Sequence, residues 1–291
     1  MQGIIIENIS NLYKVLIDKK VYEAQARGKL KKDDITPVVG DGVDVEITDE
    51  KNKKAVINGI NSRNTYIKRP KISNVTQIIF VLSTKNPKPD LLMLDKQLAY
   101  AEYLKITPII IINKIDLGDN YLEIKEEYEK IGYKVYITQA NEVQGIDKVK
   151  EILKDNISVF SGNSGVGKST LINALFNNNI TQEGEISKKN KRGKNTTTSV
   201  KLYDLGNKSY IADTPGFSSF NIEEIESKDL DKYFIEFKAH IKNCEFVGCT
   251  HIKESKCDIK EAMKNGQISQ GRYERFCYIY NELKQKEERK W

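Results

Sequence analysis

One stretch of this 291-residue chain has the glycine spacing of a phosphate-binding loop. The segment Gly162-Asn-Ser-Gly-Val-Gly-Lys-Ser169 fits the P-loop pattern, in which successive backbone N–H groups surround phosphate oxygens. Lys168 would reach the β- and γ-phosphates, and the Ser169 hydroxyl would bind Mg²⁺. The apolar run Ile157 to Phe160 precedes the loop and a helical pattern follows it, as such a site requires. We therefore predict that nucleotide is bound by Ser161, Gly162, Asn163, Ser164, Gly165, Val166, Gly167, Lys168 and Ser169.

The tetrapeptide Asn113-Lys-Ile-Asp116 indicates which base is bound. It follows the apolar run Pro108 to Ile112, at a strand end where open α/β sheets bind ligands. The Asp116 carboxylate can accept hydrogen bonds from N1–H and the exocyclic amine of guanine, a pair that adenine does not offer. The predicted nucleotide is GTP, bound by Asn113, Lys114, Ile115 and Asp116. The alternative is that these four residues only form a polar cap at the end of the strand.

Where the next predicted strand, Lys134 to Ile137, ends, Ala140 could offer its backbone N–H to the guanine O6, and a plain strand-end turn is the alternative. The base-reading motif stands about fifty residues before the phosphate loop. GTPases usually have the opposite order. The motif order therefore predicts a circularly permuted GTPase domain.

Two segments after the phosphate loop supply candidate switch residues. In Asp213-Thr-Pro-Gly216, Asp213 suits a role at Mg²⁺ and the Gly216 N–H suits the γ-phosphate. Before it, Asn195 precedes three threonines, and Thr196, Thr197 or Thr198 would close on Mg²⁺; the sequence does not say which. Phe217 stands where many GTPases carry a glutamine that orients water, so intrinsic hydrolysis should be slow.

A cluster of metal-ligand residues, Cys244-x4-Cys249-x-His251-x5-Cys257, lies near the C-terminal end. Three thiolates and one imidazole make a closed tetrahedral set, which predicts one structural zinc ion with no position for a catalytic water. The alternative is ordinary buried cysteines beside an unrelated histidine. Cys277 is predicted to be a core thiol, and His240 is predicted to be structural because it lacks matching partners.

Three regions with different patterns must position these motifs. Residues 1–68 contain short β-type runs that predict a small all-β barrel, namely Gly3 to Ile9, Leu12 to Ile17, Val43 to Ile47 and Lys54 to Ile60. Residues 69–222 alternate apolar strands with amphipathic helices, which predicts a mainly parallel α/β sheet. Residues 223–291 are charged and helical around the cysteine cluster. The predicted fold is thus a barrel, a central GTPase domain and a mainly helical zinc-binding domain.

Composition indicates a soluble globular protein, with 39% apolar and 30% charged residues. Apolar runs are far shorter than the roughly 18 residues of a membrane span, and no signal peptide is visible, so a cytoplasmic protein without membrane contact is expected. The formal net charge of +6 permits RNA binding without requiring it.

The order of these motifs, followed by the Cys-Cys-His-Cys cluster, resembles the RsgA (YjeQ) family of ribosome small-subunit-dependent GTPases. The resemblance covers essentially the whole chain. It implies an N-terminal OB-fold, a permuted GTPase domain and a zinc domain. It also implies binding to the 30S subunit and its 16S rRNA during late maturation, with GTP hydrolysis stimulated by the subunit. We expect the chain to act as a monomer.

The chain departs from the family at one position that bears on mechanism. The family usually has Gly-Arg-His before the three threonines, whereas this chain has Gly193-Lys-Asn195. Asn195 cannot act as a base near neutral pH. Hydrolysis would then depend on the ribosome or on a bound monovalent cation. Two other classes stay open, namely an RNA-binding scaffold with little turnover and a GTPase that serves the large subunit.

Overall fold

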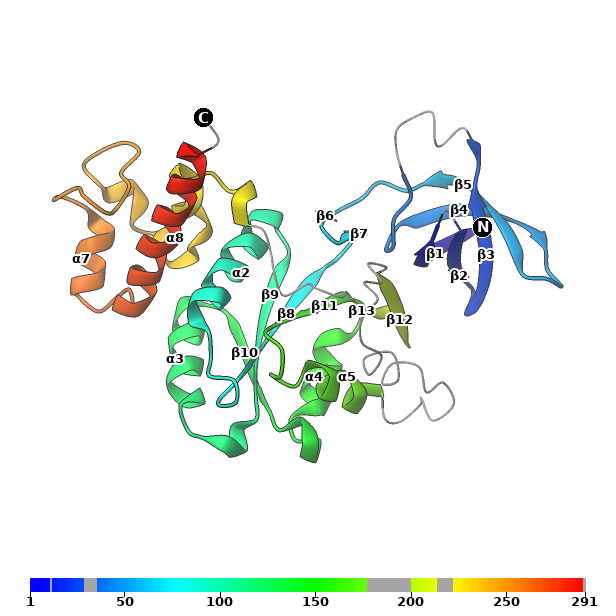
Figure 1. The fold of residues 1–291 in the computed structure, drawn as a ribbon, viewed down its shortest axis with the longest axis horizontal. Coiled ribbons are helices and arrows are strands. Elements are labelled where there is room, and N and C mark those ends of the chain that lie inside the picture. The colour runs from blue at the N-terminus through cyan, green and yellow to red at the C-terminus, as the bar shows by residue number, and fades with distance from the viewer. Residues whose placement is uncertain (11, 29–35, 177–199, 214–221, 290–291) are drawn as a thin grey trace. The chain divides into compact units, whose positions relative to one another are not determined.

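The computed structural model describes residues 1–10, 12–28, 36–176, 200–213 and 222–289 (Figure 1). The chain forms two compact units, each made of segments that are distant in sequence. The first unit comprises Met1–Ile79, Ala140–Ser161 and Gly167–Ser218. The second unit comprises Phe80–Gln139, Gly162–Val166 and Ser219–Trp291. The domain boundaries predicted after residues 68 and 222 stay predictions.

The first unit begins with a closed five-stranded barrel, which confirms the predicted all-β region. Its strands are β1 (Gln2–Ile9), β2 (Leu12–Ile17), β3 (Lys20–Ala26), β4 (Gly42–Asp49) and β5 (Lys54–Ile60). Antiparallel pairs join β1 to β2, β2 to β3, β4 to β5 and β1 to β4, and a parallel pair between β3 and β5 completes the closure. Side chains alternate between the interior and solvent along the strands, which builds a core from residues such as Ile5, Val15, Val43 and Ile57.

The rest of the first unit contains a mixed ladder of strands and helices α4 (Ile146–Leu153) and α5 (Lys168–Phe176). Strand β11 (Ile157–Ser161) pairs in parallel with β13 (Ser209–Asp213). Strand β13 pairs in antiparallel with β12 (Lys201–Gly206), which also contacts β1 of the barrel. A short ribbon, β6 (Tyr66–Lys68) and β7 (Lys71–Ser73), follows the barrel in sequence.

The predicted strands omit the short β6 and β7 and also β3 and β12, and the turns beside β3 and β12 explain why these two were missed. Asp18 and Lys19 join β2 to β3 with φ values of 45° and 66°. Asn207 and Lys208 join β12 to β13 with φ values of 49° and 56°. Two successive residues with positive φ form the turn that suits a tight hairpin, but such turns are usually recognised by a glycine. Asp18 and Lys19 include no glycine, and at β12 the glycine, Gly206 with a φ of 83°, stands before the pair rather than in it, so both turns are weak hairpin signals.

The second unit contains the apolar strands β8 (Gln77–Ser83, from Phe80 onward), β9 (Thr107–Asn113) and β10 (Lys134–Thr138). Strand β9 lies between the other two and pairs with β10 in parallel. Helix α2 (Leu91–Leu104) follows β8, and α3 (Tyr121–Ile131) follows β9. Nearly every residue of β8 and β9 is buried, which accounts for their continuous apolar sequence. The predicted alternation of strands and helices is confirmed.

The C-terminal part of the second unit consists of short 3₁₀ turns and helices α7 (Asp258–Lys264) and α8 (Gln270–Glu288). The 3₁₀ turns are η3 (Ile222–Glu224), η4 (Ser227–Tyr233), η5 (Ile235–Phe237) and η6 (Ile241–Asn243). Its core is aromatic, and the ring centres of Phe237 and Phe276 are only 4.8 Å apart. Ala99 and Tyr100 of α2 belong to the same buried cluster. The C-terminal region therefore shares its core with α2.

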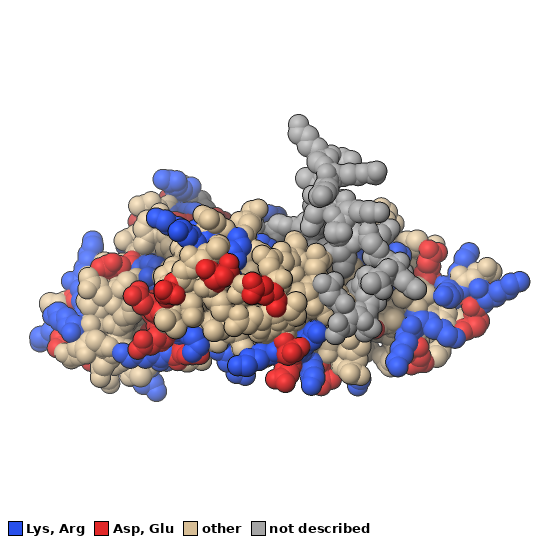
Figure 2. Space-filling view, turned by 90° about the horizontal axis from the view of Figure 1, so that it is seen from below, with Lys and Arg blue, Asp and Glu red and all other residues tan. Residues whose placement is uncertain are grey.

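The surface carries charges of both signs. On the face shown in Figure 2, Lys and Arg side chains are interspersed with Asp and Glu rather than gathered into one patch. Within the described ranges, no helix combines the length and apolar character needed to cross a membrane.

Candidate nucleotide site and metal centre

The phosphate loop connects β11 to α5, and two glycines explain its path. Gly162 has a φ of 144°, and a Cβ atom there would lie 2.2 Å from the Val81 carbonyl oxygen. Gly167 has a φ of 99°, and its carbonyl accepts the Leu171 N–H at 2.8 Å in the first turn of α5. The order strand, glycine-rich loop and helix N-terminus is that of an anion-binding site, where backbone N–H groups meet phosphate.

Asn113 holds the base-reading loop against the phosphate loop. It is the last residue of β9, and it is only 2% exposed. Its Nδ2 donates to the Val166 carbonyl oxygen at 3.0 Å, and its Oδ1 accepts from Thr138 Oγ1 at 3.0 Å. A buried amide with partners on both sides is held in one orientation. Two motifs that are far apart in sequence are thereby joined at one edge of the strands.

Lys114 adds a second connection. Its Nζ donates to the carbonyl oxygens of Gly165 and Asn86, at 2.6 Å each. The contact with Asn86 was not predicted, and it brings the segment before α2 to the phosphate loop. Asp116 is exposed in the turn η1 (Ile115–Leu117), so its carboxylate is accessible to a ligand, and Ile115 is half-buried.

The remaining predicted residues are placed individually. Lys168 starts α5 and is half-buried, and this burial lowers the pKa of its ammonium group. Ser169 is exposed beside it. Asp213 ends β13, and Ala140 is buried at the start of the turn η2 (Ala140–Glu142). Several predicted switch residues lie outside the described residues, namely Asn195, Thr196, Thr197, Thr198, Gly216 and Phe217.

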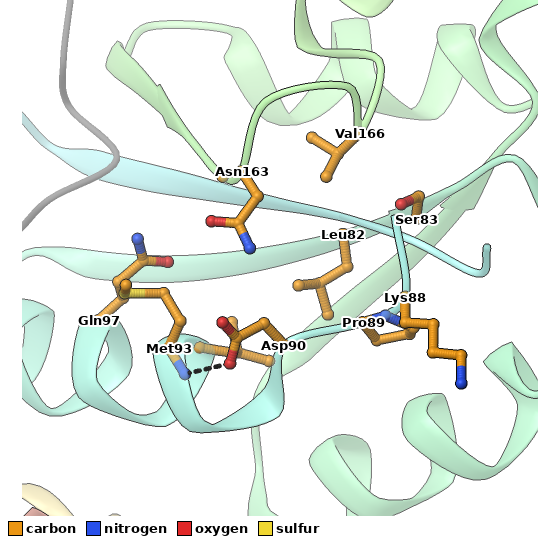
Figure 3. Close-up of a pocket in the computed structure, with 11 residues that line it drawn as sticks. Leu82, Ser83, Lys88, Pro89, Asp90, Met93, Gln97, Asn163 and Val166 are labelled. Carbon is orange, nitrogen blue, oxygen red and sulfur yellow. Dashed lines mark hydrogen bonds between the residues drawn. The ribbon is translucent and has the colours of Figure 1, made fainter. Parts of the chain in front are cut away.

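A small cavity beside the phosphate loop involves side chains that the sequence did not indicate (Figure 3). Asn163 of the loop lines it together with Asp90, Met93 and Gln97. Asp90 caps α2, because its Oδ1 accepts the Met93 N–H at 2.9 Å. An aspartate before a helical pattern is a recognisable helix start, but nothing in the sequence says that this helix faces the phosphate loop.

The four predicted metal ligands lie together. The ligand atoms of Cys244, Cys249, His251 and Cys257 all lie within 4.8 Å of one another. The Sγ atoms of Cys244 and Cys257 are 3.9 Å apart, and His251 Nδ1 lies 3.3 Å from the Cys257 Sγ. A tetrahedral ion with Zn–S bonds of about 2.3 Å sets its sulfur ligands roughly 3.8 Å apart. The observed spacing therefore fits zinc.

Groups around the cluster would orient its predicted ligands. His251 presents Nδ1 to the sulfurs, while its Nε2 lies 3.2 Å from Asp231 Oδ2, the carboxylate partner that metal-binding histidines commonly have. Tyr273 of α8 donates its hydroxyl to the His251 carbonyl oxygen at 2.7 Å. Burial alone would raise the pKa of Glu254, but hydrogen bonds from Thr250 and neighbouring amides lower it to about 2. This carboxylate therefore stays ionised and holds the loop.

Burial raises the pKa of the Cys249 thiol to about 12, and burial also raises the pKa of Cys257. Without a cation these thiols would stay protonated at neutral pH. A bound zinc ion would hold them as thiolates, so metal uptake should release protons and weaken as the pH falls.

Comparison with known proteins decides the family. Residues 60–223 match the RsgA GTPase family, and residues 2–57 match the RsgA N-terminal domain. A small ribosomal subunit biogenesis GTPase RsgA from Alkaliphilus metalliredigens is 41% identical over 97% of this chain and 98% of its own length. The chain belongs to the RsgA family. A relative of the same name from Clostridium acetobutylicum is 40% identical over 97% of this chain and 98% of its own length.

Two solved structures share the fold. YjeQ from Thermotoga maritima superimposes with a TM-score of 0.85 at 32% identity, over 97% of this chain and 98% of that one. YloQ, described as a circularly permuted GTPase, gives a TM-score of 0.81 at 31% identity, over 98% and 95%. As an RsgA family member the chain is a GTP hydrolase, and the predicted permuted motif order is confirmed.

Replacing Cys257 with serine should abolish zinc binding, because an alcohol is a poor ligand for zinc and three ligands leave the site open. Metal analysis of purified protein should find close to one zinc per wild-type chain and close to none per Cys257→Ser chain. Cys277→Ser is the matched control, since Cys277 lies outside the cluster and should not affect metal content. Full zinc content in Cys257→Ser would contradict the assigned ligand set.

Proposed function

We propose that this chain binds the small ribosomal subunit through its 16S rRNA and acts in late maturation of the 30S particle. The observation that carries the GTP site is the hydrogen bond from Asn113 to Val166, which joins the base-reading and phosphate-binding loops. The family and the names of its relatives support the small subunit as target. The proposal places the chain in the cytoplasm as a monomer with domains at 1–68, 69–222 and 223–291.

The nucleotide is held by the two loops in this proposal. Amide groups of the loop from Gly162 to Gly167 contact the phosphates, and the Lys168 ammonium neutralises charge on the β- and γ-phosphates. The Ser169 hydroxyl and the Asp213 carboxylate would hold Mg²⁺, and the ion would neutralise charge on the β- and γ-phosphate oxygens as GDP leaves. Further groups would complete the site, namely Thr196, Thr197 or Thr198 at Mg²⁺, the Gly216 N–H at the γ-phosphate, and Asn113, Lys114, Asp116 and Ala140 at the base.

Activation of the attacking water is incomplete in the chain itself. Phe217 cannot polarise water, and the Asn195 amide can position a water but cannot accept its proton near neutral pH. Slow hydrolysis by the isolated protein follows from these two residues. We therefore propose that the 30S subunit, or a monovalent cation, supplies the missing group.

The GTP state would control binding to the subunit. The segment Asp213 to Gly216 leads directly into the C-terminal region, so ordering by the γ-phosphate would act on that region. The GTP-bound protein should bind the subunit tightly, and GTP hydrolysis should release the protein from the subunit. Equal affinity of the GDP-bound and GTP-analogue-bound forms for 30S particles would contradict this, because a ligand without preference shifts no equilibrium.

GTP turnover measured alone, with 30S and with 50S subunits tests the proposal. We expect stimulation by 30S of at least about tenfold, which is equivalent to ~1.4 kcal/mol of activation free energy. The stimulation should weaken at higher salt because RNA contacts are electrostatic. Tight 30S binding without stimulation would indicate a scaffold instead, and stimulation by 50S would indicate a large-subunit factor.

A further inference from the structure

Helix α2 is buried on opposite faces. Met93 and Gln97 line the cavity beside the phosphate loop, whereas Asp95 and Ala99 belong to the side that meets the C-terminal region. Residues two positions apart on a helix point about 200° from each other, so these pairs lie on opposite sides. A single rigid helix therefore separates the phosphate loop from the C-terminal region.

Two connections tie the start of α2 to the phosphate loop. The Asn163 side chain and the first turns of α2 line the same cavity (Figure 3). In addition, Lys114 Nζ bridges the carbonyl oxygens of Gly165 in the loop and Asn86, four residues before the Asp90 cap. A change in the phosphate loop would therefore act on this end of the helix.

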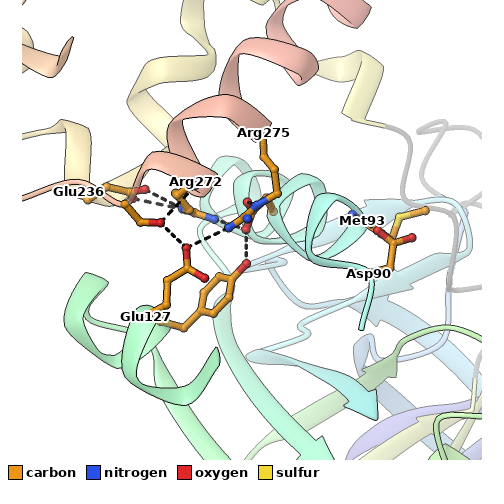
Figure 4. A network of polar contacts seen from close by, with 9 residues as sticks. Asp90, Met93, Glu127, Glu236, Arg272 and Arg275 are labelled. Carbon is orange, nitrogen blue, oxygen red and sulfur yellow. Dashed lines mark hydrogen bonds and ion pairs between the residues drawn. The ribbon is translucent and has the colours of Figure 1, made fainter. Parts of the chain in front are cut away.

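The other face of α2 is held by a buried ionic network (Figure 4). The Asp95 carboxylate is fully buried and pairs with Arg272 and Arg275 of α8, while Tyr128 Oη donates to it at 2.6 Å. Arg272 is itself fully buried and also pairs with Glu236 at 2.6 Å. Separating this buried pair would leave charges without partners, which is strongly destabilising, so α8 should follow movements of α2.

Helix α8 continues the connection to the metal centre. Tyr273, the residue after Arg272, donates to the carbonyl oxygen of the ligand His251 at 2.7 Å. The described residues thus form a continuous series of contacts from the phosphate loop, through α2 and α8, to the Cys/His cluster. This series does not pass through the segment Asp213 to Gly216.

We propose that α2 couples nucleotide occupancy of the phosphate loop to α8 and the Cys/His cluster, with Asp95 as the positioning residue. The inference rests on the proposed binding of GTP at the phosphate loop. It makes α2 a second connection between nucleotide and C-terminal region, beside the switch segment. By reciprocity, a change at the C-terminal region would also alter nucleotide affinity.

Hydrogen exchange followed by mass spectrometry tests this without ribosomes or turnover. Exchange of the amides in α8 and in residues 235–257 is compared for protein without nucleotide, with GDP and with a non-hydrolysable GTP analogue. We expect nucleotide to slow exchange of these amides about fivefold or more in the wild type. About fivefold is the lower end of the change in affinity that coupled sites typically show. In Asp95→Asn, nucleotide should bind with an affinity close to that of the wild type, while the response of α8 should fall below about twofold.

Lys96→Gln is the matched control, because it removes the 2.6 Å ion pair between Lys96 and Glu282 of the same two helices but keeps the buried network. It should respond like the wild type. If Asp95→Asn does not fold, Glu127→Gln weakens the network more mildly, at its contacts with Arg275 and Ser269, and should reduce the response partially.

The outcomes separate the two proposals. Failure of the wild type to bind guanine nucleotide would contradict the proposed function. Nucleotide binding without a response of α8, or an unchanged response in both network variants, would overturn the coupling alone.

Discussion

Replacing Asp116 with asparagine is expected to turn the nucleotide preference from GTP to xanthosine triphosphate. The asparagine side chain would direct an amide donor at the exocyclic amine of guanine, which is also a donor. The 2-oxo group of xanthine would instead accept from that amide. We expect GTP affinity to fall on the order of 10³-fold, because the unpaired donors lose their hydrogen bonds to water. Equilibrium titration with fluorescent GTP and xanthosine analogues measures both changes.

Asp119→Asn is the matched control for this experiment. Asp119 is also exposed and lies three residues further along the same loop, but it stands outside the base-reading tetrapeptide. It should retain GTP affinity and gain none for xanthosine triphosphate. An Asp116→Asn protein that still preferred GTP would show that the base is read elsewhere.

Replacing Arg272 with methionine is expected to destabilise the second unit by about 3–5 kcal/mol, the range for breaking a buried ion pair. The guanidinium is fully buried, contacts Asp95 and Glu236, and stacks 4.5 Å from the Phe234 ring centre. Methionine fills much of the space but leaves the Glu236 carboxylate without its partner and Asp95 with one cation fewer. The loss of unfolding free energy is measured by hydrogen exchange of the α2 and α8 amides at increasing urea concentration.

Lys286→Met provides the comparison on the same helix. Lys286 pairs with Glu223 and Glu282 at 3.1 Å each, and its side chain is 39% exposed. Such surface pairs contribute less than about 1 kcal/mol, so this variant should unfold close to the wild type. Similar losses of unfolding free energy in both variants would mean that the buried network stabilises the protein no more than a surface ion pair does.

The sequence indicated candidate nucleotide and metal residues because the chemistry of such sites requires particular residue types at fixed spacing. A phosphate loop needs glycines at fixed positions, as the φ values of Gly162 and Gly167 show. The Cys/His cluster likewise needs four ligands that reach one ion. Such requirements are local or involve few residues, so they can be recognised in one sequence.

The missing parts depend on contacts that are distant in sequence. Asp95 looks like an ordinary helix-surface acid until Arg272, far along the chain, covers it. The role of α2 was missed for the same reason, since its sequence predicts an amphipathic helix but not which residues pack against it. Strands β3 and β12 were missed because they pair with their neighbours across turns that have no glycine at the two central positions.

The core that α2 shares with the C-terminal region also limits which segments of this chain could be replaced by those of a related protein. The match to the RsgA GTPase family ends at residue 223, just before the core residues Ile225 and Leu230. A fragment cut there would expose the apolar surface around Ala99 and Tyr100 and remove both arginines that neutralise Asp95. A C-terminal region transplanted from a relative would need the α2 that matches it. We therefore expect α2 and the C-terminal region to be exchanged successfully only together, although much of the GTPase region lies between them in sequence.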